Sequence, residues 1–173
     1  MPIDNCHYCY NELTETVLPE YLKTLKQQID APIPMSRFTE KGIGIRTLLK
    51  QFGFQSDFPG CYVFIEKEDP IYVGISQKLV TRINQHVNGK SHFSASLAYR
   101  MTMESYDGET EQYTRKQLMN MDKFRTLFEQ KKKYLSELDV AFIEIDNPVE
   151  RYLFEIYCAM ELDTSRWNTF ETH

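Results

Sequence analysis

The spacing of apolar residues along the chain predicts an α+β fold with a small antiparallel sheet. Apolar positions recur at helical spacing over residues 16–29, 45–53, 78–88, 93–104, 113–136 and 148–162. Shorter apolar runs at 60–66, 71–75 and 138–145 are typical of strands. We therefore expect a three-stranded antiparallel sheet flanked by helices, in which the third strand joins a hairpin formed by the first two.

The predicted hairpin has the sequence PGCYVFIEKEDPIYVGIS, in which each strand carries one Tyr beside a Gly. Side chains alternate across a strand, so the pairing register decides whether Tyr62 and Tyr72 share a face. A four-residue loop over 67–70 would pair residue 66 with residue 71 and place the two tyrosines on opposite faces. We expect an odd-length loop or a β-bulge, because either would bring the two hydroxyls together.

The last predicted helix begins with Asn147–Pro148 and contains a carboxylate, Glu155, in an otherwise apolar stretch. Asn147 is expected to cap the helix, and Glu150 is explained as the capping partner three residues later. A helix that is apolar on nearly every face is usually buried, and a buried carboxylate needs a cationic partner or a metal ion. Glu155 is therefore either paired with an Arg or available as a metal ligand.

The charge of the chain is unevenly distributed. The formal net charge is −5, yet residues 71–103 contain no acidic residue at all. This stretch carries its basic groups on Lys78, Arg82, Lys90 and Arg100, together with His86 and His92. Either the segment is neutral by chance, or it forms a surface kept free of negative charge for a polyanion. Composition leaves both interpretations open.

Taken together, these residues resemble the GIY-YIG nuclease family. Gly60–Cys61–Tyr62 and Tyr72–Val73–Gly74 resemble its two signatures, with Cys61 where Ile or Val is usual. Arg82 falls in the following helix at the family's Arg position, and His86 resembles the restriction-enzyme branch. In the later block, Glu155 and Asn168 resemble the family's metal-binding Glu and its Asn. The resemblance implies a nuclease domain over 58–170 with an insertion at 91–137, preceded by a helical N-terminal extension over 1–57.

The resemblance implies a metal-dependent endonuclease that hydrolyses DNA, of restriction, defence or repair type. Glu155 would hold Mg²⁺ or Mn²⁺, and Arg82 would contact the phosphate. Tyr62 would orient or deprotonate the attacking water, with His86 as an alternative proton acceptor or as a hydrogen-bond partner of Tyr62. The catalytic set would be completed by Tyr72 and Asn168. The nucleic-acid contacts would come from Lys78, Lys90, His92 and Arg100.

Other interpretations remain open. The acidic net charge favours an alternative in which the nuclease acts on RNA or depends on a protein partner. Either a homodimer or another protein could be that partner. A further alternative is a nucleic-acid-binding module of the same fold without catalytic activity. The segment Cys6–His7–Tyr8–Cys9 suggests zinc, but a second ligand pair is missing. We expect a cytoplasmic protein with no membrane partner, for three reasons. The four Cys do not form the pattern of a disulfide framework, the N-terminus does not read as a secretory signal, and no apolar run is long enough to span a membrane.

Overall fold

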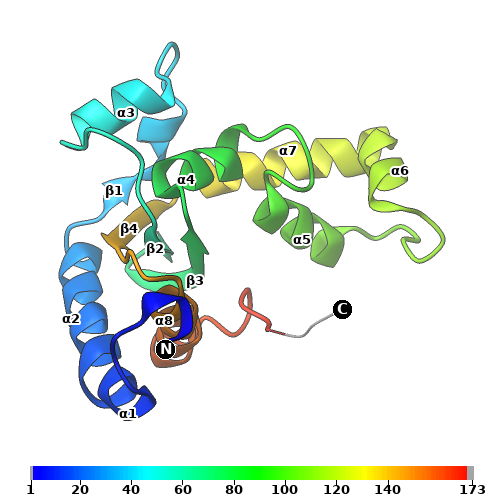
Figure 1. Ribbon diagram of the computed structural model, residues 1–173. Helices are drawn as coiled ribbons and strands as arrows, with labels where there is room; N and C mark the ends of the chain where they lie inside the picture. Colours follow the sequence, from blue (N-terminus) through cyan, green and yellow to red (C-terminus); the bar gives the residue numbers. More distant parts are fainter. Residues whose placement is uncertain (1, 171–173) are drawn as a thin grey trace.

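A four-stranded antiparallel sheet lies at the centre of the computed structural model, which describes residues 2–170. Its strand order is β1 (Ile33–Pro34), β4 (Asp139–Glu144), β2 (Gly60–Glu66) and β3 (Asp69–Ser76), with every neighbouring pair antiparallel. The predicted α+β class is confirmed, and the third predicted strand joins the hairpin as β4 (Figure 1). The two-residue strand β1 was not expected, because its segment is broken by Pro and Gly.

The hairpin between β2 and β3 is tighter than the sequence suggested. Glu66 pairs with Asp69, so only Lys67 and Glu68 form the turn, and both have positive φ angles of 49° and 77°. Two-residue turns of this kind match the twist of the flanking strands. The turn is thus two residues shorter than the four-residue loop considered from the sequence. The expected β-bulge is present, because the register shifts between Phe64, which pairs with Tyr72, and Ile65, which pairs with Pro70.

The alternation of side chains along β2 separates two hydrophobic clusters. Tyr62 and Phe64 lie on one face, in a cluster with the buried side of α4 (Leu79–Asn88). Cys61, Val63 and Ile65 lie on the other face, where α8 (Pro148–Glu161) and α2 (Leu18–Ile29) pack. The sheet is thus covered on both sides, which explains why β2 is apolar at nearly every position.

The remaining helices extend the first cluster. They are α3 (Ile45–Gln51), α5 (Ser96–Ser105), α6 (Arg115–Asn120) and α7 (Asp122–Ser136). The short helix α1 (Tyr10–Glu12) near the N-terminus has no buried residue and does not belong to this cluster. Figure 1 shows α5, α6 and the far end of α7 reaching away from the sheet as an arm. The single helix expected over 113–136 is broken at Met121, whose backbone is extended (φ −79°, ψ 125°).

The start of α8 confirms one expectation and corrects another. The Asn147 side chain accepts hydrogen bonds from the backbone N–H groups of Val149 and Glu150, as expected for an N-cap. Glu150 is not a capping partner, however. Its buried carboxylate accepts a hydrogen bond of 2.6 Å from the Tyr21 hydroxyl, so it fixes α2 against α8 instead.

Within residues 2–170, no helix combines the length and the apolar character that crossing a bilayer would require.

Candidate active site

The two signature tyrosines lie side by side on the α4 face of the sheet. The register places Tyr62 opposite Gly74, two residues from Tyr72, and the ring centroids of the two tyrosines are 6.2 Å apart. Tyr62 is 1% exposed, whereas Tyr72 is partly exposed. The bulge beyond Phe64 keeps both hydroxyls on one face despite the short turn.

Position 74 has room only for a glycine, because the Tyr62 side chain occupies the space where a Cβ atom would lie. A Cβ atom at position 74 would overlap the Oη and Cζ atoms of Tyr62. Gly74 therefore leaves room for the Tyr62 ring. Gly60 also has no room for a Cβ, but there it is the backbone carbonyl of Ile143 that lies against it.

Gly74→Ala should therefore destabilise the protein by about 1–3 kcal/mol, since overpacking forces the Tyr62 ring out of its position. Thermal unfolding should show a fall in Tm of several degrees. Gly44→Ala is the matched control, because position 44 has no atom within 4 Å of an added Cβ and an ordinary φ of −101°. Equal Tm values for the two variants would contradict this account of Gly74.

His86 is the hydrogen-bond partner of Tyr62. The distance from the Tyr62 Oη to the His86 Nε2 is 2.6 Å, and both side chains are buried. Burial lowers the pKa of His86 well below its usual value, and the positive charge of Arg82 lowers it further. His86 is therefore neutral near pH 7. Its second ring nitrogen, Nδ1, is buried and has no partner among the described residues.

Arg82 is held by the segment that follows its helix. Its guanidinium donates from Nη1 to the carbonyl of Ser94 at 2.9 Å and from Nη2 to the Ser96 Oγ at 2.7 Å. The same charge lowers the pKa values of Tyr62 and Tyr72, opposing the upward shift that burial gives to both. Arg82 is thus held by Ser94 and Ser96 at a place where its charge acts on both tyrosines.

Glu155 lies on α8 and acts electrostatically on the same two tyrosines as Arg82. Its carboxylate raises the pKa values of Tyr62 and Tyr72. Burial alone raises the pKa of Glu155 itself to about 7. Over residues 2–170, no Lys, Arg or His forms an ion pair with Glu155 within 4.0 Å. The Arg partner considered from the sequence is therefore not seen there.

The donor set at Glu155 fits a hard divalent cation. A half-buried carboxylate without a cationic partner lies near two phenolic oxygens, and oxygen ligands are those that Mg²⁺ and Mn²⁺ prefer. In the described part of the chain no cluster of three or more His, Cys, Asp and Glu side chains is arranged as a metal cage. A single carboxylate is sufficient for Mg²⁺, which keeps several of its waters.

Asn168 contacts the edge of the sheet through its side-chain amide. Its Oδ1 accepts from the N–H of Val73 at 2.9 Å, and its Nδ2 donates to the carbonyl of Val73 at 2.8 Å. Val73 lies between Tyr72 and Gly74, so this pair of hydrogen bonds fixes the strand that carries Tyr72. Arg100 fixes the same C-terminal segment by donating to the Trp167 carbonyl at 2.6 Å and to the Thr169 Oγ1 at 3.0 Å.

Asn168→Ala should loosen the outer edge of β3, because both hydrogen bonds to Val73 are lost. We expect a loss of about 1–3 kcal/mol in unfolding free energy and faster hydrogen exchange at the Val73 amide. Asn168→Asp keeps an acceptor for the N–H but repels the carbonyl, so its effect should be intermediate. An unchanged exchange rate in Asn168→Ala would show that the amide does not fix the strand.

Of the expected nucleic-acid contacts, Lys78 and Lys90 are exposed and flank α4 at its two ends. His92 is partly exposed and lies against Phe93, with ring centroids 4.0 Å apart and the ring planes tilted by 40°. Arg100 is occupied by the C-terminal segment, as described above. The cysteines considered for zinc are separated in environment: Cys6 is buried near Glu150, and Cys9 is exposed.

Sequence reasoning missed the residues that position Arg82. Asp57 caps α4 from 23 residues away, with its carboxylate oxygens accepting from the N–H groups of Val80 at 2.9 Å and Thr81 at 3.0 Å. Ser94 and Ser96 hold the guanidinium. Asp57 lies before the hairpin and is therefore not adjacent to the helix in sequence, so no capping pattern signals it.

The comparisons with known proteins agree with the sequence signatures. The family model described as "GIY-YIG catalytic domain" matches residues 58–135, which confirms the resemblance to this family. Tyr62, Tyr72, Arg82 and His86 lie within the matched residues, and Glu155 and Asn168 lie beyond them. No curated protein matches the sequence.

Two solved structures are similar to the chain. Both are the GIY-YIG N-terminal endonuclease domain of UvrC from Thermotoga maritima, as tyrosine-to-phenylalanine point mutants bound to the catalytic divalent cation. The sequence identities are 18% and 21% and the TM-scores 0.37 and 0.34, and in each case 72% of this chain and 94% of the other are covered.

Proposed function

We propose that the protein is an endonuclease that hydrolyses phosphodiester bonds of DNA and requires Mg²⁺ or Mn²⁺. The observation that carries this proposal is the convergence of four side chains from four elements, the strands β2 and β3 and the helices α4 and α8. Arg82 on α4 and Glu155 on α8 act with opposite sign on the pKa values of Tyr62 and Tyr72 in the sheet. The match of residues 58–135 to the GIY-YIG catalytic domain supports the same chemistry. We take 58–170 as the nuclease unit and the cytoplasm as its location.

The exposure of Tyr72, Tyr62 and His86 decides the role that each side chain has in the reaction. Tyr72 is the more exposed tyrosine, so its hydroxyl contacts the attacking water, in place of the buried Tyr62 hydroxyl expected from the resemblance. The Tyr62 hydroxyl lowers the pKa of Tyr72 by hydrogen bonding, and His86 holds Tyr62 in turn. Tyr62 thus supports Tyr72, and His86 positions Tyr62 without contacting substrate.

Arg82 contacts the scissile phosphate, because its fixed guanidinium presents N–H groups beside the two hydroxyls. Glu155 would hold the divalent cation, with phenolic oxygens nearby. When bound, such an ion neutralises charge on the phosphate and favours deprotonation of bound water and of nearby phenols. Without that positive charge, burial keeps the pKa values of both tyrosines above their usual range.

The test is incubation of the purified protein with supercoiled plasmid and with RNA, each in chelator, Mg²⁺ or Mn²⁺. Nicking or linearisation of the plasmid only with metal is the expected result. Cleavage of RNA alone would favour the RNA-directed alternative. The net charge of −5 favours a second arm with cell extract, since a protein partner would supply positive charge. Binding without cleavage under every condition would indicate a non-catalytic module.

Lys90→Glu should weaken DNA binding if the acid-free stretch 71–103 faces the substrate. The plot of the logarithm of the DNA-binding constant against the logarithm of the salt concentration should also become less steep by about one unit of slope, because one phosphate contact is lost. Lys26→Glu on α2 is the matched control, since Lys26 is also exposed but lies on the helix covering the opposite face of the sheet. Equal losses in the two variants would mean that the 71–103 stretch is not a specific DNA surface.

A further inference from the structure

A cavity of about 540 Å³ lies between α5, the start of α6 and the C-terminal segment. This volume is within the range of small-ligand sites in proteins. None of the side chains that line it is acidic. The lining residues that carry the argument are His92, Ser96, Tyr99, Arg100, Tyr113 and Arg115.

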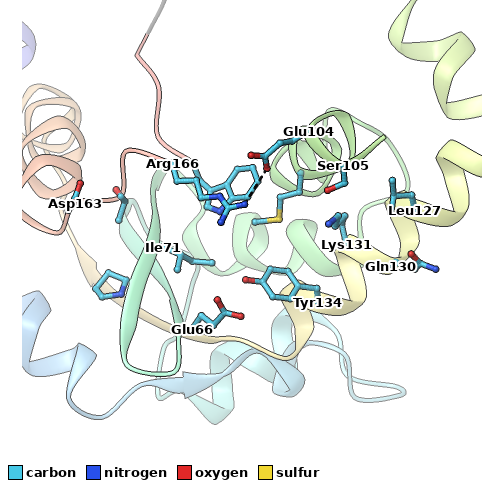
Figure 2. A pocket seen from close by; sticks show the side chains of 14 residues that line it. Glu66, Ile71, Glu104, Ser105, Leu127, Gln130, Lys131, Tyr134, Asp163 and Arg166 are labelled. Atoms are coloured by element: carbon cyan, nitrogen blue, oxygen red, sulfur yellow. Dashed lines mark ion pairs between the residues drawn. The ribbon is translucent and has the colours of Figure 1, made fainter. Parts of the chain in front are cut away.

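The charge of this cavity differs from that of the neighbouring one. The neighbouring cavity lies beside the hairpin and has a volume of about 420 Å³. Its lining includes the carboxylates of Glu66, Glu104 and Asp163 as well as Lys131 and Arg166 (Figure 2), and Arg166 pairs with Glu104 at 3.7 Å. In the first cavity, by contrast, neither Arg100 nor Arg115 forms an ion pair with a carboxylate of residues 2–170. Glu109 and Glu111 lie in the adjacent loop. The first cavity is therefore the one suited to an anionic ligand.

Aromatic rings accompany these arginines. The Arg115 guanidinium lies 5.7 Å from the centre of the Tyr99 ring, and the His92 ring lies 5.5 Å from it. The Phe93 ring lies tilted against the His92 ring and is 73% exposed, and Tyr113 is 38% exposed. Exposed aromatic rings beside arginines are the arrangement on which bases of unpaired nucleic acid stack.

Two separate sets of hydrogen bonds connect the lining of this cavity to the candidate active site. Ser96 lines the cavity and accepts the hydrogen bond from the Arg82 Nη2. Arg100 lines it as well, and donates to the segment whose Asn168 holds Val73 beside Tyr72. A strand whose phosphate contacts Arg82 would therefore have its adjacent nucleotide at the mouth of this cavity.

We propose that this cavity binds an unpaired nucleotide of the substrate strand, next to the phosphate that is cleaved. The base would stack on Phe93 and Tyr113, and Arg115 would contact the flanking phosphate. A base within a duplex is stacked on its neighbours and cannot enter such a cavity, so the site favours DNA that is single-stranded or unpaired near the cut. This inference rests on the proposed nuclease function.

The test compares binding to two fluorescein-labelled DNAs in chelator, where no strand is cut. One is a fully paired duplex, and the other has the same sequence with one strand unpaired at its centre. The wild type should bind the second more tightly. In Tyr113→Ala the ratio of the two affinities should fall about tenfold, the size expected for losing one stacked base. In Arg115→Gln the ratio should also fall, because Arg115 contacts the flanking phosphate only when the base has entered the cavity. Lys116→Gln, an exposed neighbour outside the lining, should keep the wild-type ratio.

A second readout uses 2-aminopurine as the unpaired base, because its fluorescence is quenched on stacking. Quenching by the wild type but not by Phe93→Ala or Tyr113→Ala is the expected result. An unchanged affinity ratio and unchanged quenching in all of these variants would overturn the nucleotide site. That failure is separate from failure of the proposed function, which would be seen as the absence of metal-dependent cleavage by the wild type. Thermal melting of each variant, with Tm near the wild-type value, ensures that folded proteins are compared.

Discussion

Glu155→Gln is expected to abolish metal-dependent cleavage while leaving the fold intact. The substitution keeps the size and shape of the side chain but removes the negative charge available to the cation. Removing one electrostatic element of an active site typically costs about 10²–10³-fold in rate, and we expect a loss at least this large. Initial rates of plasmid nicking in saturating Mg²⁺ measure it.

The stability of this variant gives an independent prediction, with a defined dependence on pH. The pKa of Glu155 is raised by burial from 4.5 to about 7, so ionising this group disfavours the folded, metal-free protein. Its neutral form is fully populated in the folded state below about pH 4.5, and the associated stability is lost as pH rises through 7. In chelator at pH 8, Glu155→Gln should therefore melt at a higher temperature than the wild type, whereas at pH 5 the difference should be small.

Added Mg²⁺ should raise the Tm of the wild type but not that of Glu155→Gln, because only the carboxylate binds the ion and ligand binding stabilises the folded state. Glu161→Gln is the matched control: it removes an exposed carboxylate from the same helix and should behave as the wild type in both assays. Full cleavage by Glu155→Gln, or a lower Tm in chelator at pH 8, would contradict the role of Glu155 as a metal ligand.

Much of the sheet could be predicted from local pattern, and the turn could not. The strands over 60–66, 71–75 and 138–145 follow from short apolar runs, because burial on both faces leaves few polar positions. The turn at Lys67–Glu68 requires positive φ at both residues, a conformation that neither favours. The bulge was inferred from a functional requirement, that Tyr62 and Tyr72 share a face, and the register bears this out.

The candidate site was predictable where its residues lie close in sequence to a signature. The contacts that hold it together join distant segments. Asp57 caps α4 across 23 residues, and Asn168 reaches Val73 across 95. Neither contact has a local pattern, since each depends on the packing of the completed sheet. Glu150 shows the opposite error, because a capping pattern was present but the side chain bonds to Tyr21 in another helix.

Arg82→Ala is expected to have the second large effect, a loss of about 10²–10³-fold in cleavage rate, because the phosphate loses its donor. Arg82→Lys keeps the charge but not the planar fork of N–H groups, so it should recover only part of the activity. The optimum of the pH–rate profile should also move. Arg82 lowers the pKa values of Tyr62 and Tyr72, and without it proton removal from either tyrosine requires higher pH.

The structural contacts of Arg82 require a separate control, because the same guanidinium holds Ser94 and Ser96. Ser96→Ala removes one of these hydrogen bonds and leaves Arg82 in place, so we expect less than about a tenfold loss of rate and no shift of the pH optimum. A role limited to holding the 91–96 segment would give Ser96→Ala and Arg82→Lys similar losses, with an unchanged pH optimum in every Arg82 variant. A large rate loss in Arg82→Ala accompanied by the shift to higher pH would instead place the guanidinium beside the reacting groups, because only a charge near the tyrosines moves their titration.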